Sequence, residues 1–210
     1  MTNSDLKLSS IYLSGSDVAV GSACYITLVT QGHANLFGGI SEGVMCLSRV
    51  GEIIQSIWLR LPNYFPIHQD IWSIMPNHLH AIVWLIDLGN GSASKGNDGP
   101  TPWHVLEETL PNHHIQGSLS GSLDAIIQNY KAVTSRKVHQ YQANESIAKL
   151  SNNSNGLPRE TASRLFGRLW KRSYYSQMIG SQAELDQVRR YISENPHRWC
   201  EDEQNMERPM

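Results

Sequence analysis

The sequence contains no apolar run long enough to cross a lipid bilayer. A membrane-spanning helix needs ~20 consecutive apolar residues, and no stretch of this chain approaches that length. The first ten residues, MTNSDLKLSS, also lack the basic start and apolar stretch of a secretory signal. We therefore expect a cytoplasmic protein with no membrane partner.

Cysteine is scarce and widely spaced. The three cysteines, Cys24, Cys46 and Cys200, form no C-x-x-C pair. This excludes a disulfide framework and gives no sign of a cysteine zinc site. Hydrophobic residues make up 40% of the chain and charged residues only 17%, which excludes a wholly disordered or collagen-like protein.

The length of 210 residues suits one domain, and we assign residues 1–210 to a single domain. Its core is expected in residues 22–86 and 122–199, where apolar residues recur. Residues 87–121 are rich in Gly, Ser, Asn, Asp and Pro and have no periodicity, which is typical of a flexible insertion.

Charge is unevenly distributed along the chain. The formal net charge is −2, which by itself argues against a nucleic-acid-binding protein. Residues 131–198, however, contain twelve Lys and Arg against five acidic residues. This third of the chain could form a basic face that attracts phosphate, or simply a solvated helix surface.

Apolar patterning predicts an α+β protein. Strands are expected at residues 24–30, 71–75, 79–86 and 169–179, with a short hairpin at 36–47. Helices are expected at 48–61, from 123 onward, and at about 181–194, where Ser181 and Glu184 form a capping-box pattern. This order fits an antiparallel sheet with packed helices better than a doubly wound parallel sheet.

Two histidines have the spacing of a metal site. His78 and His80 lie two residues apart in a predicted strand, so their side chains project from the same face. Paired imidazoles accept divalent transition metals. A structural pair of hydrogen-bonded histidines is an equally open interpretation of this pattern.

Tyr191 and Asn195 form a second notable pair. They are four residues apart, so they lie on the same side of the last predicted helix, just before Pro196. A tyrosine can act as a nucleophile, but its ordinary pKa of about 10 requires a metal or base nearby. Tyr174 and Tyr175 are rivals for this role, although their strand-like context favours core packing or base stacking.

Taken together, four segments resemble the REP-associated tyrosine transposases, a branch of the single-tyrosine HUH (IS200-like) transposase family. The resemblance runs in order from about Tyr25 to Trp199 and skips the 87–121 insertion. The segments are Met75–Val83, Tyr130–Arg136, Leu169–Tyr175 and Tyr191–Pro196.

The resemblance implies a ferredoxin-like antiparallel sheet with helices packed on one face. It implies that His78, His80 and Asn195 bind a divalent ion, Mg²⁺ or Mn²⁺, and that Tyr191 is the nucleophile. Asn195 replaces the glutamine of the insertion-sequence branch but agrees with the Asn-Pro ending of the REP-associated branch. Lys171 and Gln177 are further departures, since relatives often have glutamine and histidine there.

The resemblance further implies an enzyme that cleaves and rejoins single-stranded DNA beside hairpins or palindromic repeats, through a covalent 5′-phosphotyrosine. The expected backbone contacts come from basic residues near the predicted site. These are Lys131, Arg136, Arg168, Lys171 and Arg172.

Two alternatives remain open at this stage. The first is a metal-dependent hydrolase that uses water as the nucleophile, which usually needs further Asp, Glu or His ligands that the sequence does not display. The second is a domesticated protein that binds hairpin DNA without cleaving it. We expect a monomer rather than a homodimer.

Overall fold

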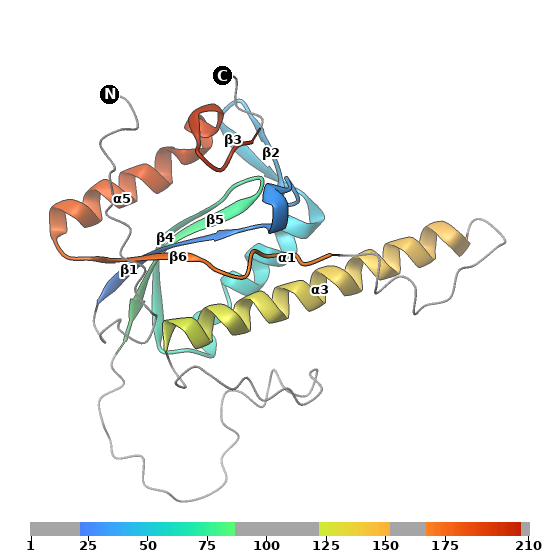
Figure 1. Ribbon diagram of the computed structural model, residues 1–210, viewed down its shortest axis with the longest axis horizontal. Helices are drawn as coiled ribbons and strands as arrows, with labels where there is room; N and C mark the ends of the chain where they lie inside the picture. Colours follow the sequence, from blue (N-terminus) through green and yellow to red (C-terminus); the bar gives the residue numbers. More distant parts are fainter. Residues whose placement is uncertain (1–21, 87–121, 152–166, 207–210) are drawn as a thin grey trace, which may run out of the picture.

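The computed structural model describes residues 22–86, 122–151 and 167–206 of the chain (Figure 1). A four-stranded antiparallel sheet, ordered β4-β5-β1-β6, forms its centre, and β2 and β3 form a separate hairpin. The strands are β1 (Ala23–Val29), β2 (Gly38–Ser41), β3 (Val44–Leu47), β4 (Ile67–Ile74), β5 (His78–Leu85) and β6 (Tyr175–Ile179). The α-helices are α1 (Arg49–Trp58), α3 (Leu123–Ser151) and α5 (Gln182–Glu194), and the short 3₁₀ helices are η3 (Gln31–His33), η4 (Leu61–Asn63) and η5 (Asn195–Glu201).

The predicted α+β class and the ferredoxin-like antiparallel sheet are confirmed. The sheet elements and main helices follow one another as β1-α1-β4-β5-α3-β6, which is the βαββαβ order of a ferredoxin-like fold. Strand β1 lies in the middle, paired with β5 on one side and β6 on the other. Side chains of β5 and β6 that point to the same side of the sheet therefore lie on either side of β1.

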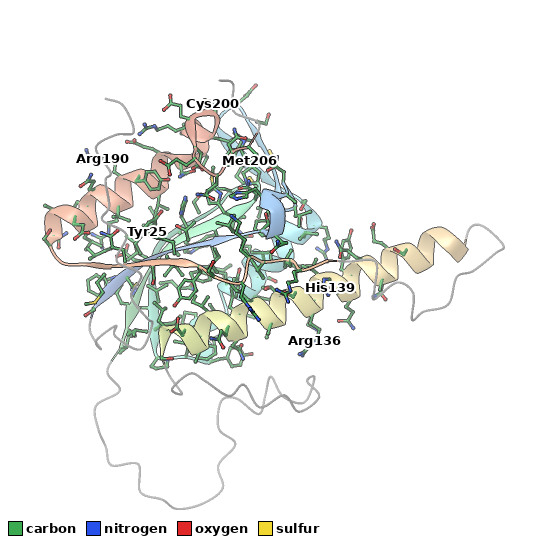
Figure 2. The ribbon with its side chains drawn as sticks, viewed as in Figure 1. Tyr25, Arg136, His139, Arg190, Cys200 and Met206 are labelled. Atoms are coloured by element: carbon green, nitrogen blue, oxygen red, sulfur yellow. The ribbon has the colours of Figure 1, made fainter. Side chains whose placement is uncertain are left out.

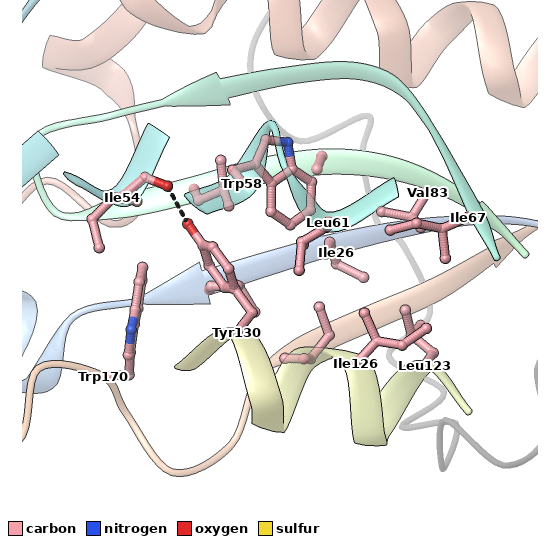
Figure 3. Packing of buried hydrophobic residues seen from close by; sticks show 14 of the residues in the cluster. Ile26, Ile54, Trp58, Leu61, Ile67, Val83, Leu123, Ile126, Tyr130 and Trp170 are labelled. Carbon is pink, nitrogen blue, oxygen red and sulfur yellow. Dashed lines mark hydrogen bonds between the residues drawn. The ribbon is translucent and has the colours of Figure 1, made fainter. Parts of the chain in front are cut away.

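The main core lies between the sheet and the pair of helices α1 and α3. Alternate residues of β1, such as Ile26, point toward these helices and meet Trp58 and Leu123 in one buried cluster (Figure 3). The hydroxyl of Tyr130 donates a hydrogen bond to the carbonyl of Ile54 at 3.1 Å. This bond joins α3 to α1 inside the apolar layer, where an unpaired hydroxyl would be costly.

Helix α5 lies on the opposite face of the sheet from α1 and α3 (Figure 1). Its residues Leu185, Val188 and Ile192 pack on Tyr25 and Ile82, which point away from the main core. The expectation that the helices share one face is therefore correct for α1 and α3 and wrong for α5. The physical reason is that the other face of β1 and β5 also carries apolar residues, which need a cover of their own.

The sequence placed most boundaries close to the observed ones. Ser48 and Ser181 cap α1 and α5, because their side chains accept from the backbone N–H groups of Gly51 and Glu184. The strand expected at 169–179 is shorter, since only Tyr175–Ile179 joins the sheet. Upstream of it, Trp170 makes a single bridge to Thr30.

The predicted insertion at 87–121 lies outside the described residues. Among the residues that the structure describes, no helix has the length and apolar character needed to cross a membrane.

Candidate metal and nucleophile site

His78 and His80 lie side by side on β5, on the face of the sheet that α5 covers. Their ring centroids are 4.3 Å apart, as expected for residues two apart on a strand. Both side chains are buried, with 0% and 3% of their surface exposed. The Nε2 atoms of both rings are buried and have no hydrogen-bond partner within the described part of the chain.

The other ring nitrogen of each histidine is held by neighbours. Nδ1 of His78 lies 2.8 Å from Oδ1 of Asn77. Nδ1 of His80 lies 2.8 Å from the hydroxyl of Tyr25 and 2.9 Å from Oγ1 of Thr27. A metal-binding histidine typically anchors one nitrogen in this way and presents the other to the ion.

Burial keeps both imidazoles neutral. It lowers the pKa of His80 to about 3. The pKa of His78 is well below its usual range because of burial first, and then because of the nearby His80 and His33. Neutral imidazoles have free lone pairs at pH 7, so the pair is ready to bind a metal without losing a proton.

Asp202 completes a three-residue group that the sequence analysis missed. It follows η5, is buried, and places Oδ2 3.9 Å from Nε2 of His78. One ligand atom from each of His78, His80 and Asp202 lies within 4.8 Å of the others. In the sequence Asp202 is one acid in a Glu-Asp-Glu run at no motif spacing, so only tertiary structure identifies it.

Tyr191 lies beside His80, and Asn195 lines a small hollow together with Tyr191 and Asp202. The Tyr191 ring is 5.4 Å from the His80 ring and 6.4 Å from the Tyr25 ring, measured between centroids. Burial and the Asp202 carboxylate raise the pKa of Tyr191, while a side-chain hydrogen bond from Asn195 lowers it. Oδ1 of Asn195 is buried and has no partner among the described residues.

Helix α5 is fixed on the sheet at a point close to Tyr191. Arg189 forms a two-point ion pair with Asp70 of β4, with Nη2–Oδ2 and Nε–Oδ1 distances of 2.6 and 3.1 Å. The indole of Trp84 on β5 donates to the same carboxylate at 3.2 Å. This contact joins α5 to two strands and so helps to fix the position of Tyr191 relative to the histidines.

A cavity of about 370 Å³ opens beside these residues. Lys171 is the one cationic side chain in its lining, and it also contacts Nε2 of His33. Asp202 and Glu203 supply negative charge on the same wall. The full lining is Thr27, Val29, His80, Lys171, Ser173, Tyr174, Tyr175, Tyr191, Asp202, Glu203 and Gln204.

Tyr174 and Tyr175 line the cavity, but their hydroxyls are already engaged. The hydroxyl of Tyr174 donates to Asp124 and that of Tyr175 to Gln177, both at 2.5 Å. Neither contact is with the histidine pair. Of the three tyrosines that the sequence offered as nucleophiles, Tyr191 is therefore the one whose ring contacts that of His80.

Four of the five predicted basic residues line a second, more open hollow of about 340 Å³; they are Lys131, Arg168, Lys171 and Arg172. Arg168 and Arg172 are exposed. Arg136 projects from α3 away from the sheet (Figure 2) and does not line this hollow. A phosphate chain crossing this surface would meet several cations.

Lys131 has a different environment from the other basic residues. Its Nζ donates to the backbone carbonyls of Lys171, Arg172 and Ser173 at 3.0, 3.3 and 2.9 Å. Burial lowers its pKa to about 8. Lys131 thus supports the segment that carries Lys171 and Arg172.

The residues present fit a divalent ion. Two imidazole nitrogens and an amide oxygen that have no hydrogen-bond partner among residues 22–86, 122–151 and 167–206, together with a buried carboxylate, are the donors that such ions bind in proteins. An unsatisfied buried acceptor costs stability, and a bound cation would satisfy several at once. The buried group of His78, His80 and Asp202 could therefore hold a metal ion.

Comparisons with known proteins identify distant relatives. No protein-family model matches the chain. A Haemophilus influenzae protein described as uncharacterized is 27% identical over 180 residues, which is 85% of this chain and 82% of that protein.

The comparison with solved structures found low-scoring similarities, of which two are described here. One is a REP-associated tyrosine transposase bound to a REP hairpin, with 11% identity, a TM-score of 0.43, and coverage of 86% of this chain and 70% of that one. The other is a crystal structure of a proposed transposase from Deinococcus radiodurans, with 12% identity, a TM-score of 0.35, and coverage of 86% and 95%.

Proposed function

We propose that this protein is a metal-dependent enzyme that cleaves and rejoins single-stranded DNA at hairpins or palindromic repeats, with Tyr191 as the nucleophile. The observation that carries the proposal is the pair of buried Nε2 atoms of His78 and His80 beside the Tyr191 ring, for which the described residues offer no hydrogen-bond partner. Buried polar atoms that serve only the stability of a protein are normally hydrogen-bonded.

The candidate metal ligands are His78, His80 and Asp202, with Asn195 as a further donor beside Tyr191. A bound Mg²⁺ or Mn²⁺ would polarise a phosphate ester and stabilise the charge that develops on it. Asp202 adds a carboxylate to the set expected from the sequence. Hard divalent ions favour such an oxygen ligand.

Tyr191 performs the bond exchange. Its hydroxyl loses a proton to solvent, and the oxygen attacks phosphorus. The bond from phosphorus to the departing 3′-oxygen breaks, and that oxygen takes up a proton to become a 3′-hydroxyl. The 5′-phosphate remains on Tyr191, so a second 3′-hydroxyl can reverse the exchange and join a new strand.

The residues around Tyr191 prepare this attack. The hydrogen bond from Asn195 stabilises a negative charge on the tyrosine oxygen. Lys171 lies in the wall of the same cavity and would neutralise an approaching phosphate.

DNA beyond the cleavage point would follow the basic hollow. Arg168, Lys171 and Arg172 are the proposed contacts to phosphate, and Arg136 is a proposed contact farther along α3. Lys131 contributes by holding the 171–173 backbone in place. Because His78, His80, Asp202 and Tyr191 come together within one chain, one copy of the protein would suffice for the proposed reaction, and we propose that it acts as a monomer.

The test is a search for a covalent protein–DNA adduct. Purified protein is incubated with labelled single-stranded hairpin oligonucleotides, taken from repeats flanking its own gene, with Mn²⁺, Mg²⁺ or EDTA. We expect an adduct that survives denaturation, requires the metal and is lost in Tyr191→Phe. Tyr175→Phe is the matched control, because it removes a hydroxyl from the same cavity and is expected to retain the adduct.

Other results would point to other functions. Tight hairpin binding with no adduct in any metal, across several flanking repeats, would indicate a non-cleaving DNA-binding protein. Cleavage that is unaffected in Tyr191→Phe would show that the tyrosine is not the nucleophile.

One observation favours a second candidate, a hydrolase that uses water. Such an enzyme needs an acidic ligand beside the two histidines, and Asp202 provides one in the structure. In that case Tyr191→Phe would still cut DNA and release a free 5′-phosphate, and the wild-type protein would form no covalent adduct.

A further inference from the structure

Asn77 is the last residue of the turn between β4 and β5, and its side chain is completely buried. Its amide nitrogen donates to two backbone carbonyls, that of His33 at 3.1 Å and that of Gln204 at 2.7 Å. Its amide oxygen lies 2.8 Å from Nδ1 of His78. Both N–H groups and the oxygen of this side chain are therefore engaged.

These partners allow only one orientation of the amide. If the oxygen and nitrogen exchanged places, the oxygen would face two carbonyl oxygens, and none of the three can donate. The amide oxygen must therefore face His78. Because this oxygen only accepts, Nδ1 of His78 must carry the ring hydrogen.

This fixes the tautomer of His78. In its neutral form an imidazole carries one ring hydrogen, and the contact with Asn77 places that hydrogen on Nδ1. With the hydrogen on Nδ1, Nε2 has a free lone pair, and Nε2 is the atom that lies 3.9 Å from Asp202. His80 differs, because its Nδ1 faces the hydroxyls of Tyr25 and Thr27, which can donate or accept.

Asn77 also anchors the segment that carries Asp202. Gln204, whose carbonyl accepts from Asn77, donates its own backbone N–H to Oδ1 of Asp202 at 2.7 Å. The backbone N–H of Asn205 donates to the carbonyl of Asp202 at 3.0 Å. Asn77 thus holds a tight turn whose first residue is the third member of the candidate ligand group.

We propose that Asn77 is a positioning residue that sets the tautomer of His78 and holds Asp202 against it. One side chain thereby prepares two ligands that lie far apart in the sequence. The tautomer follows from the hydrogen bonds alone, whereas the effect on metal binding rests on the proposed function. The two parts can be tested separately.

The first experiment measures the tautomer in the metal-free protein. Long-range ¹H–¹⁵N spectra in EDTA distinguish a ring nitrogen that carries hydrogen from a bare one, and His78→Ala assigns the signals. In the wild-type protein we expect hydrogen on Nδ1 of His78 and a bare Nε2. In Asn77→Ala we expect a mixture of both tautomers. A wild-type pattern in Asn77→Ala would overturn the first part of the proposal.

Asn77→Asp separates the contact with His78 from the contact with the Asp202 segment. It is also the variant to use if Asn77→Ala does not fold. The carboxylate keeps the acceptor for Nδ1 but cannot donate to the carbonyl of Gln204. At about pH 8, where histidine is neutral, we expect the wild-type tautomer in this variant. Hydrogen on Nε2 instead would overturn the assignment.

The second experiment measures Mn²⁺ affinity by titration calorimetry. Loss of a residue that orients a metal ligand typically costs 10–100-fold in affinity, and we expect a loss of about that size in Asn77→Ala and Asn77→Asp. Asn205→Ala is the matched control, because it removes a buried amide of the same segment that donates to the carbonyl of Trp199. Its affinity should stay within about twofold of wild type.

The outcomes distinguish the two hypotheses. Wild-type affinity in both Asn77 variants would overturn the second part of the proposal. If the wild-type protein binds no Mn²⁺, the proposed metal site fails, whereas the tautomer measurement still decides whether Asn77 orients His78.

Discussion

The rings of His80 and Tyr191 lie 5.4 Å apart between centroids and are inclined at 65°. The first comes from an inner strand of the sheet and the second from the last α-helix, so their proximity depends on how α5 sits on the sheet. The contact places the candidate nucleophile next to a candidate metal ligand. The predictions below follow from this arrangement.

Tyr191 is expected to remain protonated above the ordinary tyrosine range in the metal-free protein. Burial and the Asp202 carboxylate raise its pKa, and a bound divalent ion should lower that pKa by favouring the phenolate. Ultraviolet titration in EDTA and in Mn²⁺, compared with Tyr191→Phe, isolates this one phenol. An ordinary pKa near 10 in EDTA would contradict the prediction.

Asp202→Asn should weaken Mn²⁺ binding by about tenfold or more, because it removes the only negative charge in the buried group. The amide retains an acceptor for the Gln204 N–H, so the local turn should survive. Glu203→Gln is the matched control, since Glu203 is exposed on the wall of the same cavity. Equal losses in the two variants would mean that general electrostatics, and not coordination by Asp202, determines affinity.

Asp70→Asn should lower the midpoint of thermal unfolding and reduce adduct formation. The variant loses the charge of a two-point ion pair with Arg189 and so loosens α5 near Tyr191. Asp186→Asn removes a longer, exposed contact of 3.4 Å with the same arginine and should have little effect. The prediction fails if both substitutions shift the midpoint equally.

In EDTA, the free energy of unfolding should fall as the pH is lowered below about 6.5. The folded protein holds His78 and His80 neutral with lowered pKa values, while the unfolded chain binds protons at both positions. Stability is therefore full above the unfolded pKa and is lost toward the folded pKa, which is about 3 for His80. Each histidine contributes about 1.4 kcal/mol per pH unit in that window.

Urea unfolding between about pH 7 and pH 4 measures this slope. His80→Gln should reduce the slope, and the exposed His68→Gln should leave it unchanged. An unaltered slope in His80→Gln would show that His80 is not held neutral in the folded state.

The fold was largely predictable because its signals are local. The apolar run of β1, the caps at Ser48 and Ser181, and the turn containing Pro76 can all be identified from short stretches of sequence. The side of the sheet that α5 covers could not be predicted, because it depends on which face of β1 has room for Leu185 and Val188 after α1 and α3 have packed. The role of Lys131 beneath the 171–173 backbone depends on the same long-range packing.

The residues of the candidate site likewise differ in whether the sequence alone could point to them. His78, His80, Tyr191 and Asn195 could be named from the sequence because their spacings mark one face of a strand or helix and the family resemblance points to the same positions. Their roles stay predictions. Asp202 has no such spacing and reaches the histidines only because η5 turns the chain back toward β5. Asn77 lies within a segment noted in the sequence, but its hydrogen bonds to His33 and Gln204 join three distant parts of the chain.

The alternation of side chains along β1 gives the two faces of this strand different neighbours. Cys24, Ile26 and Leu28 face the main core, whereas Tyr25 and Thr27 face the histidines. Substitutions at the first set should act mainly on the core under α1 and α3, whereas those at Tyr25 and Thr27 should change the contacts of His80 and, at Tyr25, the packing of α5. An insertion or deletion within the strand would exchange the two faces and so disturb both sets at once.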